Sequence, residues 1–377
     1  MTETQAPRLP GLDVLRAAAI VWVLFYHASL FDFIPDSWWI VGFGWFGVDL
    51  FFALSGFLIA GQLLRPVVRG RSPDYGRFFF RRLLRTLPAF FVIVMVYLLF
   101  PALRETPVLP PVWEFFTFTE NLLVHIPPQK ALSQIWSLCV EEQFYLVLPL
   151  AVACLSLKPT PMRTGAAILG TLLMGILIRG AIWFDIHDHF FPAYQELIYY
   201  PTWARLDDLL LGVGAVTIRV FRPRWWGRIV KYPDRLLGAG LLGIVCAMAA
   251  LAYAFTNLWT VMLAPVLVGA SMMLLVTAGS TDRSVIARLS CKPVRALAAG
   301  AYSLYLSHKI AFHIVRDALA PAMRLSPLAT ILLAFPVALV LGACLYCCVE
   351  RPFLKLRTRL GGPARTPLMA DMAAEMR

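Results

Sequence analysis

The chain has 377 residues, of which 59% are hydrophobic and only 15% are charged. A soluble domain is normally about 45–50% hydrophobic and about 25% charged, and a water-soluble globule of this size could not hide so much apolar side chain. The composition therefore excludes intrinsic disorder, a disulfide scaffold and an ordinary soluble enzyme. It predicts an all-α protein that crosses a membrane several times.

Ten stretches are apolar over a sufficient length, since a helix needs roughly 20 residues to cross a bilayer. In chain order they are 12–31, 40–64, 82–102, 135–155, 164–183, 202–221, 235–254, 258–278, 296–315 and 327–348. We expect one integral-membrane domain over 1–377, with a helical core over about 12–348 and a basic tail over 349–377.

Basic residues gather in alternate linkers, which by the positive-inside rule face the cytoplasm. They are Arg65, Arg69, Arg71, Arg77, Arg81, Arg222, Arg224, Arg228, Lys231, Arg283, Arg288, Lys292 and Arg295, followed in the tail by Arg351, Lys355, Arg357, Arg359 and Arg365. The linkers 32–39 and 255–257 hold no Lys or Arg. This pattern predicts that both termini are cytoplasmic in a multi-pass protein of the inner, cytoplasmic membrane. Because topology accounts for the net charge of +12, we expect no nucleic-acid partner.

The first span carries two ionisable residues, Arg16 and His27, eleven positions apart. At about 100° and 1.5 Å per residue, they lie on one face of a helix, about 16 Å apart along its axis. Ionisable groups inside a membrane are costly and usually mark function. The alternative is an arginine that reaches the surface and a structural histidine.

Other spans bring more ionisable groups to similar depths. They are Asp49 in the second span, Glu141 and Glu142 in the fourth, Arg205, Asp207 and Asp208 at the start of the sixth, and His308 in the ninth. We expect them to converge on one polar cavity. A histidine beside a carboxylate is the pairing that a general base needs, but it would serve a proton-coupled transporter equally well.

Two further clusters lie at the ends of spans. Arg81, Arg82 and Arg85 begin the third span, where they either anchor the helix at the cytoplasmic surface or bind phosphate through their guanidinium groups. His187, Asp188 and His189 share one short loop without a fourth ligand, which makes a poor metal site. We therefore expect no metal.

At this point the chain resembles the integral-membrane acyltransferase 3 family, whose members move acyl groups from coenzyme A thioesters to sugar hydroxyls. The family's spacing of Arg, ten residues and His falls on Arg16 and His27. Seven similar blocks occur in family order between Gly11 and Arg357: GLDVLRAAAIVWVLFYHA, FGVDLFFALSGFLI, RRLLRTLP, WSLCVEEQFYL, RLDDLLLG, YSLYLSHK and VERPFLKLR.

The resemblance implies roles for particular residues. It implies His27 as the catalytic base, with Glu142 or Glu141 as its carboxylate partner and His308 as a further catalytic candidate. The residues implied on the acyl-CoA and substrate side are Arg16, Arg81, Arg82, Arg85, Asp49, Arg205, Asp207 and Tyr305. Two positions depart from the family, because Cys139 and Asp208 stand where relatives commonly have a small hydroxyl residue and Gly.

The implied function is transfer of an acyl group, most simply acetyl from acetyl-CoA, to a hydroxyl of a cell-envelope carbohydrate, without a permanently bound cofactor. Many relatives carry an SGNH hydrolase-like domain after the last span, whereas about 29 residues follow Cys348 here. We therefore expect either transfer by this protein alone, as a monomer or homo-oligomer, or delivery to a separate acyl-accepting partner. Two alternatives stay open: a proton-coupled transporter or flippase of lipid-linked glycans, and the same chemistry on a small molecule such as a macrolide.

Overall fold

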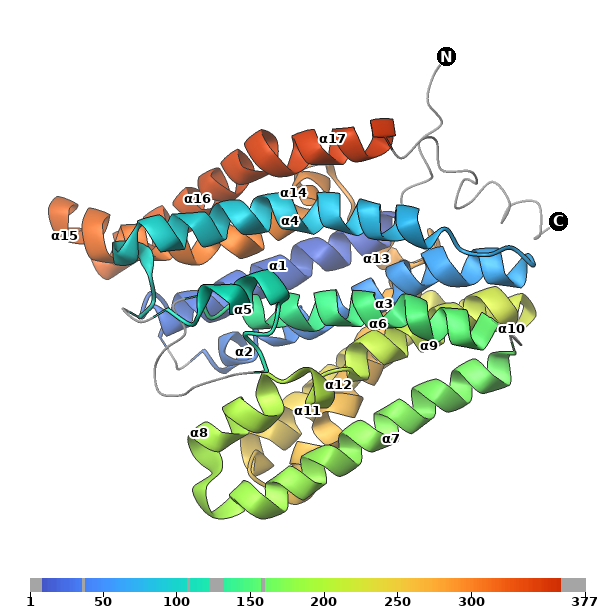
Figure 1. Ribbon diagram of the computed structural model, residues 1–377. Helices are drawn as coiled ribbons and strands as arrows, with labels where there is room; N and C mark the ends of the chain where they lie inside the picture. The colour runs from blue at the N-terminus through green and yellow to red at the C-terminus, as the bar shows by residue number, and fades with distance from the viewer. Residues whose placement is uncertain (1–8, 36–37, 107–108, 123–131, 157–159, 361–377) are drawn as a thin grey trace.

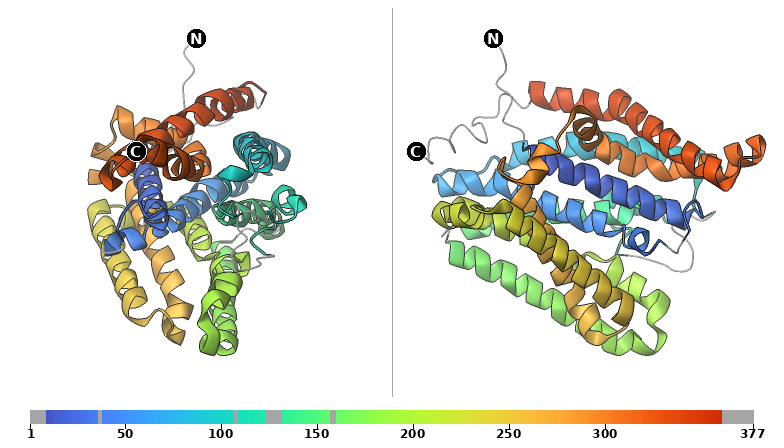
Figure 2. Two further views of the ribbon diagram at one scale, coloured as in Figure 1. Left: turned by 90° about the vertical axis from the view of Figure 1, so that its left-hand side faces the viewer. Right: turned by 180° about the vertical axis from the view of Figure 1, so that it is seen from behind.

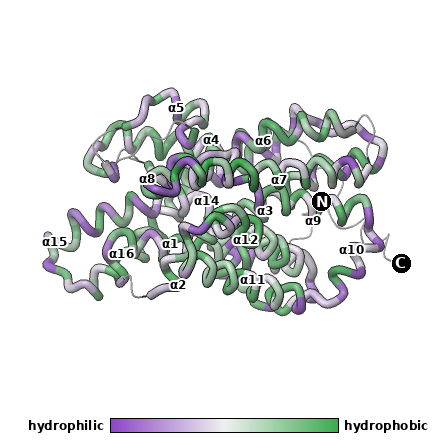
Figure 3. The backbone as a smooth tube through the Cα atoms, turned by 90° about the horizontal axis from the view of Figure 1, so that it is seen from below, coloured by the Kyte–Doolittle hydropathy of each residue, from purple (hydrophilic) through white to green (hydrophobic). Residues whose placement is uncertain are grey.

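The computed structural model describes residues 9–35, 38–106, 109–122, 132–156 and 160–360, with the backbone alone at 155 and 156. Within these ranges every regular element is a helix. Figure 1 shows the long helices running along one bundle, and Figure 3 shows apolar residues along most of their length. In the part of the chain that the structure describes, eight helices are long and apolar enough to cross a membrane, so this is an all-α, multi-pass membrane protein.

Ten main helices coincide with the ten predicted spans. They are α1 (Pro10–Leu30), α3 (Phe46–Val68), α4 (Tyr75–Leu99), α6 (Ile135–Ser156), α7 (Pro161–Ile186), α9 (Asp207–Phe221), α11 (Pro233–Ala254), α12 (Leu258–Gly279), α14 (Lys292–His313) and α16 (Pro327–Leu345). The shorter helices are α2 (Trp39–Gly42), α5 (Val112–Thr117), α8 (Phe190–Tyr194), α10 (Pro223–Ile229), α13 (Val285–Arg288), α15 (Ala320–Met323) and α17 (Arg351–Leu360).

Two of the predicted spans, α9 and α14, are not among the eight membrane-crossing candidates. The span expected at 202–221 is shorter because Thr202–Ala204 forms a separate 3-10 turn, so that α9 starts at Asp207 and has 15 residues. α14 has 22 residues but a polar sequence. Its second half is buried from Ser303 to His313, so it faces other helices instead of lipid.

The centre of the bundle is formed by α1 and α3, as the end-on view in Figure 2 shows. In the apolar stretch of α3, 78% of residues are buried, against 11% in the stretch that contains α7, which is therefore peripheral. Glycines let α3 and α9 touch through their backbones. A Cβ on Gly56 would lie 2.1 Å from the carbonyl oxygen of Leu209, and one on Gly212 would lie 2.4 Å from that of Ala53.

The second predicted span starts later than expected. The stretch 40–64 is broken into α2 and α3, because the chain turns at Gly44, where it packs closely on α1. A Cβ on Gly44 would lie 2.4 Å from the carbonyl oxygen of Trp22, so only glycine fits there. The predicted tail at 349–377 is helical at its start, since a π-helical turn over Tyr346–Glu350 leads directly into α17. The remaining tail residues, 361–377, lie outside the described ranges.

Candidate active site

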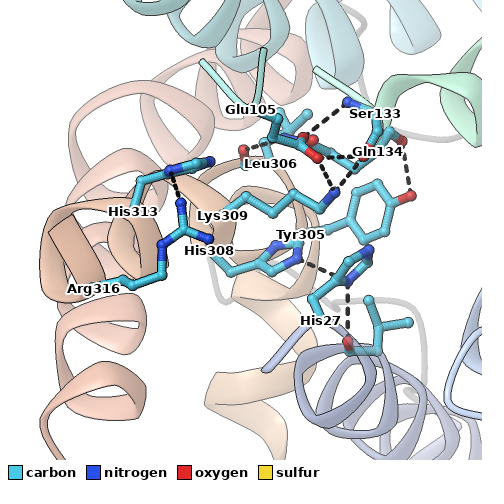
Figure 4. A network of polar contacts seen from close by, with 11 residues as sticks. His27, Glu105, Ser133, Gln134, Tyr305, Leu306, His308, Lys309, His313 and Arg316 are labelled. Carbon is cyan, nitrogen blue, oxygen red and sulfur yellow. Dashed lines mark hydrogen bonds and ion pairs between the residues drawn. The ribbon is translucent and has the colours of Figure 1, made fainter. Parts of the chain in front are cut away.

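The two histidines singled out in the sequence form a pair. His27 lies in the last turn of α1 and His308 near the end of α14, and these helices pack against each other. Nε2 of His308 lies 3.1 Å from Nδ1 of His27 (Figure 4). Both side chains are buried, with 8% of His27 and 0% of His308 exposed. Residues 281 positions apart in sequence thus make one site.

The surrounding carbonyl oxygens fix which nitrogen carries each proton. Nδ1 of His308 lies 3.1 Å from the carbonyl oxygen of Leu304, which can only accept, so this nitrogen donates and the other nitrogen accepts. Nδ1 of His27 lies 3.1 Å from the carbonyl oxygen of Val23 and 3.1 Å from that accepting nitrogen, so it also carries a proton. Nε2 of His27 therefore keeps its lone pair, and the described residues give it no hydrogen-bond partner. Such a nitrogen can take a proton from a hydroxyl group.

An ion pair lies beside the histidines. Nζ of Lys309, the residue after His308, donates to Oε2 of Glu105 over 2.8 Å and to the hydroxyl of Ser133. Ser133 in turn donates to Glu105 from its backbone N–H, over 3.0 Å, and from its hydroxyl, over 2.8 Å. This cluster joins the segment after α4, the segment before α6 and α14 at the level of the histidine pair (Figure 4).

Tyr305 makes a second connection between α14 and the start of α6. Its hydroxyl lies 2.6 Å from that of Ser137 and donates to the carbonyl oxygen of Gln134 over 2.8 Å. The ring of Tyr305 lies against His308, with ring centroids 5.9 Å apart. The amide of Gln134 donates to the carbonyl oxygen of Leu306 over 3.3 Å. Tyr305 therefore supports the histidine pair and has its hydroxyl already occupied.

The carboxylates expected beside His27 lie in a different cluster. Glu141 accepts from the hydroxyls of Ser55, over 2.7 Å, and Tyr145, over 3.0 Å. Glu142 lies beside Thr86 and Arg82. Among the described residues no carboxylate is hydrogen-bonded to His27, whose ring partner is His308. The expected pairing of Glu142 or Glu141 with His27 is therefore wrong. Both carboxylates lie on α6 at least one turn after Ser137, where they face α3 and α4.

The arginines expected on the acyl-CoA side come together near these carboxylates. Arg16 pairs with Asp13 over 3.3 Å, and the charges of Arg82 and Arg85 act on it. Arg82 lies over the ring of Tyr145, 5.7 Å from its centroid. Arg81 is near Arg77 and Asp74 instead.

Arg85 has one buried acidic partner. Its Nη1 lies 3.4 Å from Oε1 of Glu350, whose other oxygen accepts from the hydroxyl of Ser303 over 2.6 Å. A third of the Arg85 side chain stays exposed, whereas that of Glu350 is fully buried. We call Arg16, Arg82 and Arg85 the arginine cluster. It lies at the end of the bundle where α1 and α4 begin, opposite the end that holds His27.

The remaining candidates pair with one another in a third group. Arg205 donates to Asp49 over 2.6 Å, and the rings of Trp45, Trp136 and Tyr199 surround its guanidinium at 5.1 to 5.9 Å. Asp208 faces Asp49, and the two buried carboxyl groups interact directly. These residues therefore tie α3 to the start of α9, and a role for Arg205 in substrate binding stays a prediction.

Asp207 has a partner that was not singled out from the sequence. Arg179 of α7, fully buried, donates to both carboxylate oxygens of Asp207 over 2.6 and 3.0 Å. It also donates to the carbonyl oxygens of Ala204 and Met262. The sequence could have indicated Arg179, because it is the one charged residue within the predicted span 164–183, and a charge inside a membrane span usually has a partner. Lys309 carried the same signal, as a lysine inside the span 296–315.

The loop with His187, Asp188 and His189 makes contacts other than those of a metal site. His187 stacks on Trp183, with ring centroids 4.8 Å apart, and its Nδ1 lies 3.1 Å from the carbonyl oxygen of Phe184. Across the described part of the chain, no three His, Cys, Asp or Glu side chains are grouped so that they could hold a metal ion.

The sequence of the chain is similar to those of known proteins. The chain is 31% identical over 221 residues to the O-acetyltransferase OatA of Staphylococcus aureus, covering 55% of this chain and 34% of the relative. It is 27% identical over 319 residues to the peptidoglycan O-acetyltransferase OatA of Listeria monocytogenes and 26% over 318 to the putative peptidoglycan O-acetyltransferase YrhL of Bacillus subtilis. These two matches cover 80% of this chain and 49% and 48% of the relatives.

The chain thus spans half or less of the length of these curated relatives. No solved structure matches it at a significant level. The family model described as "Acyltransferase domain" matches residues 9–347, which include both histidines and the arginine cluster. Since the match extends over nearly all of the helical bundle, the chain belongs to this acyltransferase family.

Proposed function

We propose that the protein is a membrane O-acetyltransferase that moves an acetyl group from acetyl-CoA to a hydroxyl of a cell-wall glycan. One structural observation carries the proposal: Nε2 of His27 is a base in a buried site that has no hydrogen-bond partner among the described residues, while the other ring nitrogen is held by Val23 and His308. Membership of the acyltransferase family and the similarity to peptidoglycan O-acetyltransferases support the reaction class and the acceptor.

The donor would bind at the arginine cluster. Coenzyme A carries several phosphate charges, and guanidinium groups bind phosphate oxygens through paired hydrogen bonds. Arg16 and His27 lie on one face of α1, about 16 Å apart along the helix, so an extended pantetheine arm would lead the thioester from Arg16 towards His27. The basic linkers favour a cytoplasmic position for this end of the bundle and for both termini, in the inner membrane of the cell.

The transfer would proceed with His27 as the general base. The acceptor oxygen attacks the carbonyl carbon of the thioester while its proton moves to Nε2 of His27. Nδ1–H of His27, held by His308, steadies the imidazolium formed in this step. The carbon–sulfur bond then breaks, and the departing thiolate takes the proton back from His27. Glu141 and Glu142 lie with the arginines, where they would orient Arg82.

The test uses membrane vesicles that contain the protein, acetyl-labelled acetyl-CoA and soluble glycan strands released from peptidoglycan. We expect label on the glycan with wild type and none with His27→Ala. Equal label with both proteins would rule out His27 as the base. Absence of label with both, while labelled glycan lipid is carried across the vesicle membrane, would replace the proposal with transport. In a parallel assay with a macrolide added, label on the macrolide but not on the glycan would retain acetyl transfer as the reaction and replace the glycan as the acceptor.

A further inference from the structure

Lys309 has more hydrogen-bond donors than it has partners among the described residues. Its side chain is buried, with only 3% exposed. An ammonium group has three N–H donors, and the described residues supply two acceptors, the carboxylate of Glu105 and the hydroxyl of Ser133. A donor left unpaired in a buried site costs free energy. The third N–H therefore marks a place for an acceptor atom that the described residues do not provide.

The position of this ammonium is next to the histidine pair. Lys309 follows His308 directly in α14, and its charge acts on both His27 and His308. In Figure 4 the ammonium lies between Glu105 and the ring of Tyr305, on the side of the pair towards the start of α6. The ammonium and His27 thus belong to one cluster, in which the charge of Lys309 acts on the base that takes the hydroxyl proton.

The ammonium is also fixed in place before any ligand binds. Glu105 holds it over 2.8 Å, and Ser133 holds Glu105 through two further hydrogen bonds of 3.0 and 2.8 Å. Groups that stabilise a transition state are most effective when they are oriented in advance in a site from which water is excluded. A lysine that only tied two segments together would not need a free donor beside a catalytic base.

We propose that Lys309 is a catalytic residue whose third N–H donates to the acyl carbonyl oxygen as that oxygen becomes an oxyanion. This inference rests on the proposed O-acyl transfer. When the acceptor oxygen bonds to the carbonyl carbon, the π electron pair moves onto the carbonyl oxygen and the hydroxyl proton moves to His27. When the intermediate collapses, that pair re-forms the carbonyl bond, the carbon–sulfur bond breaks and the thiolate takes the proton from His27. Lys309 keeps all its protons throughout.

The experiment measures kcat and KM for acetyl-CoA with the full-length protein in liposomes and glycan strands as the probe acceptor. Lys309→Met keeps the length of the side chain and removes its charge. We expect kcat to fall by about 10²–10³-fold, as for the loss of an oxyanion donor, while KM for acetyl-CoA changes less than about 2-fold. Lys292→Met, at the exposed start of the same helix, is the matched control and should behave as wild type.

A second readout separates chemistry from a structural role. With Lys309→Ala, added ethylammonium should restore part of the lost kcat, because a small cation can occupy the vacated site. A purely structural lysine would not give this rescue. If Lys309→Met does not fold, Glu105→Gln keeps the ammonium but loosens its anchor, and we then expect kcat to fall about 10-fold at unchanged KM.

The outcomes distinguish this inference from the function on which it rests. A wild-type protein that transfers no acetyl group contradicts the proposed function. A wild-type protein that is active, with Lys309→Met or the folded Glu105→Gln at wild-type kcat, overturns the role of Lys309 alone. A rise in KM without a fall in kcat overturns it as well, because it would place Lys309 in substrate binding.

Discussion

The ion pair of Arg179 with Asp207 and the pair of His27 with His308 are both buried in this bundle. They differ in how many of their polar atoms have a hydrogen-bond partner. Arg179 is fully buried and donates to both oxygens of Asp207 and to two backbone carbonyl oxygens. His27, which is 8% exposed, has one nitrogen held by Val23 and His308, while the described residues give the other nitrogen no partner.

The difference separates a structural role from a chemical one. Burying a charge is costly, and a group kept only for stability repays that cost best when all of its donors and acceptors are used. Arg179 and Asp207 satisfy this condition, and they join α7 to the start of α9. At the histidine pair, the open positions are Nε2 of His27 and the third N–H of Lys309. Burial alone would not have distinguished the two groups.

The largest expected effect is the loss of transfer in His27→Ala. General base catalysis contributes about 10²–10⁴-fold, so we expect kcat to fall by about 10³-fold or more. The temperature of unfolding should fall only modestly, because the variant breaks one buried hydrogen bond to His308 and no ion pair. Rates of glycan acetylation in vesicles measure the first quantity, and tryptophan fluorescence on heating measures the second. His187→Ala, an exposed histidine, is the control, and a fall of less than 10-fold in His27→Ala would contradict the comparison.

The next effect concerns stability and comes from Arg179→Leu. Removing one partner of a buried ion pair costs about 3–5 kcal/mol, because Asp207 is left charged and unpaired. We expect the free energy of unfolding in detergent to fall by this amount, while Arg163→Leu, exposed at the start of the same helix, leaves it unchanged. The double variant Arg179→Leu with Asp207→Leu should be more stable than Asp207→Leu alone. If the two effects simply add, the pair does not interact as described.

Much of the fold could be predicted because it depends on apolar length alone. Ten apolar stretches became the ten main helices, with most boundaries within a few residues. The break before α3 could not be predicted, since it depends on Gly44 meeting α1, a contact between distant segments. The length of α9 was also missed, because the stretch 202–206 is apolar enough but turns before the helix begins.

The sequence identified most residues of the candidate site but not which of them contact one another. His27 and His308 were both recognised as ionisable groups in spans, but their contact depends on how α1 and α14 are rotated against each other. Helix rotation also explains the error at Glu142. Neighbouring positions on a helix point about 100° apart, so small rotations decide whether a carboxylate faces a histidine or, as here, the arginines of α4. Arg179 and Lys309 were visible as charges in apolar spans, yet their partners were not.

The third prediction sharpens the comparison within the histidine pair. If His308 serves as the acceptor for Nδ1–H of His27, His308→Leu should lower kcat about 10²-fold, because the imidazolium loses its support. His308→Gln places an amide oxygen near the position of Nε2 and should retain kcat within about 10-fold of wild type. Measurement of kcat in vesicles checks both variants. Equal losses in Leu and Gln variants would mean that His308 acts by another route, such as taking the proton itself.

The smallest effect is expected at the arginine cluster, where a partly exposed group would bind the donor. One third of the Arg85 side chain is exposed, and Glu350 already neutralises part of its charge over 3.4 Å. Loss of one such hydrogen bond to phosphate should therefore raise KM for acetyl-CoA about 10-fold in Arg85→Gln and leave kcat nearly unchanged. Arg71→Gln, exposed in the linker before α4, is the matched control. A fall in kcat at constant KM would place Arg85 near the reacting atoms. The thioester of the donor would then have to lie near the arginine cluster and not near His27.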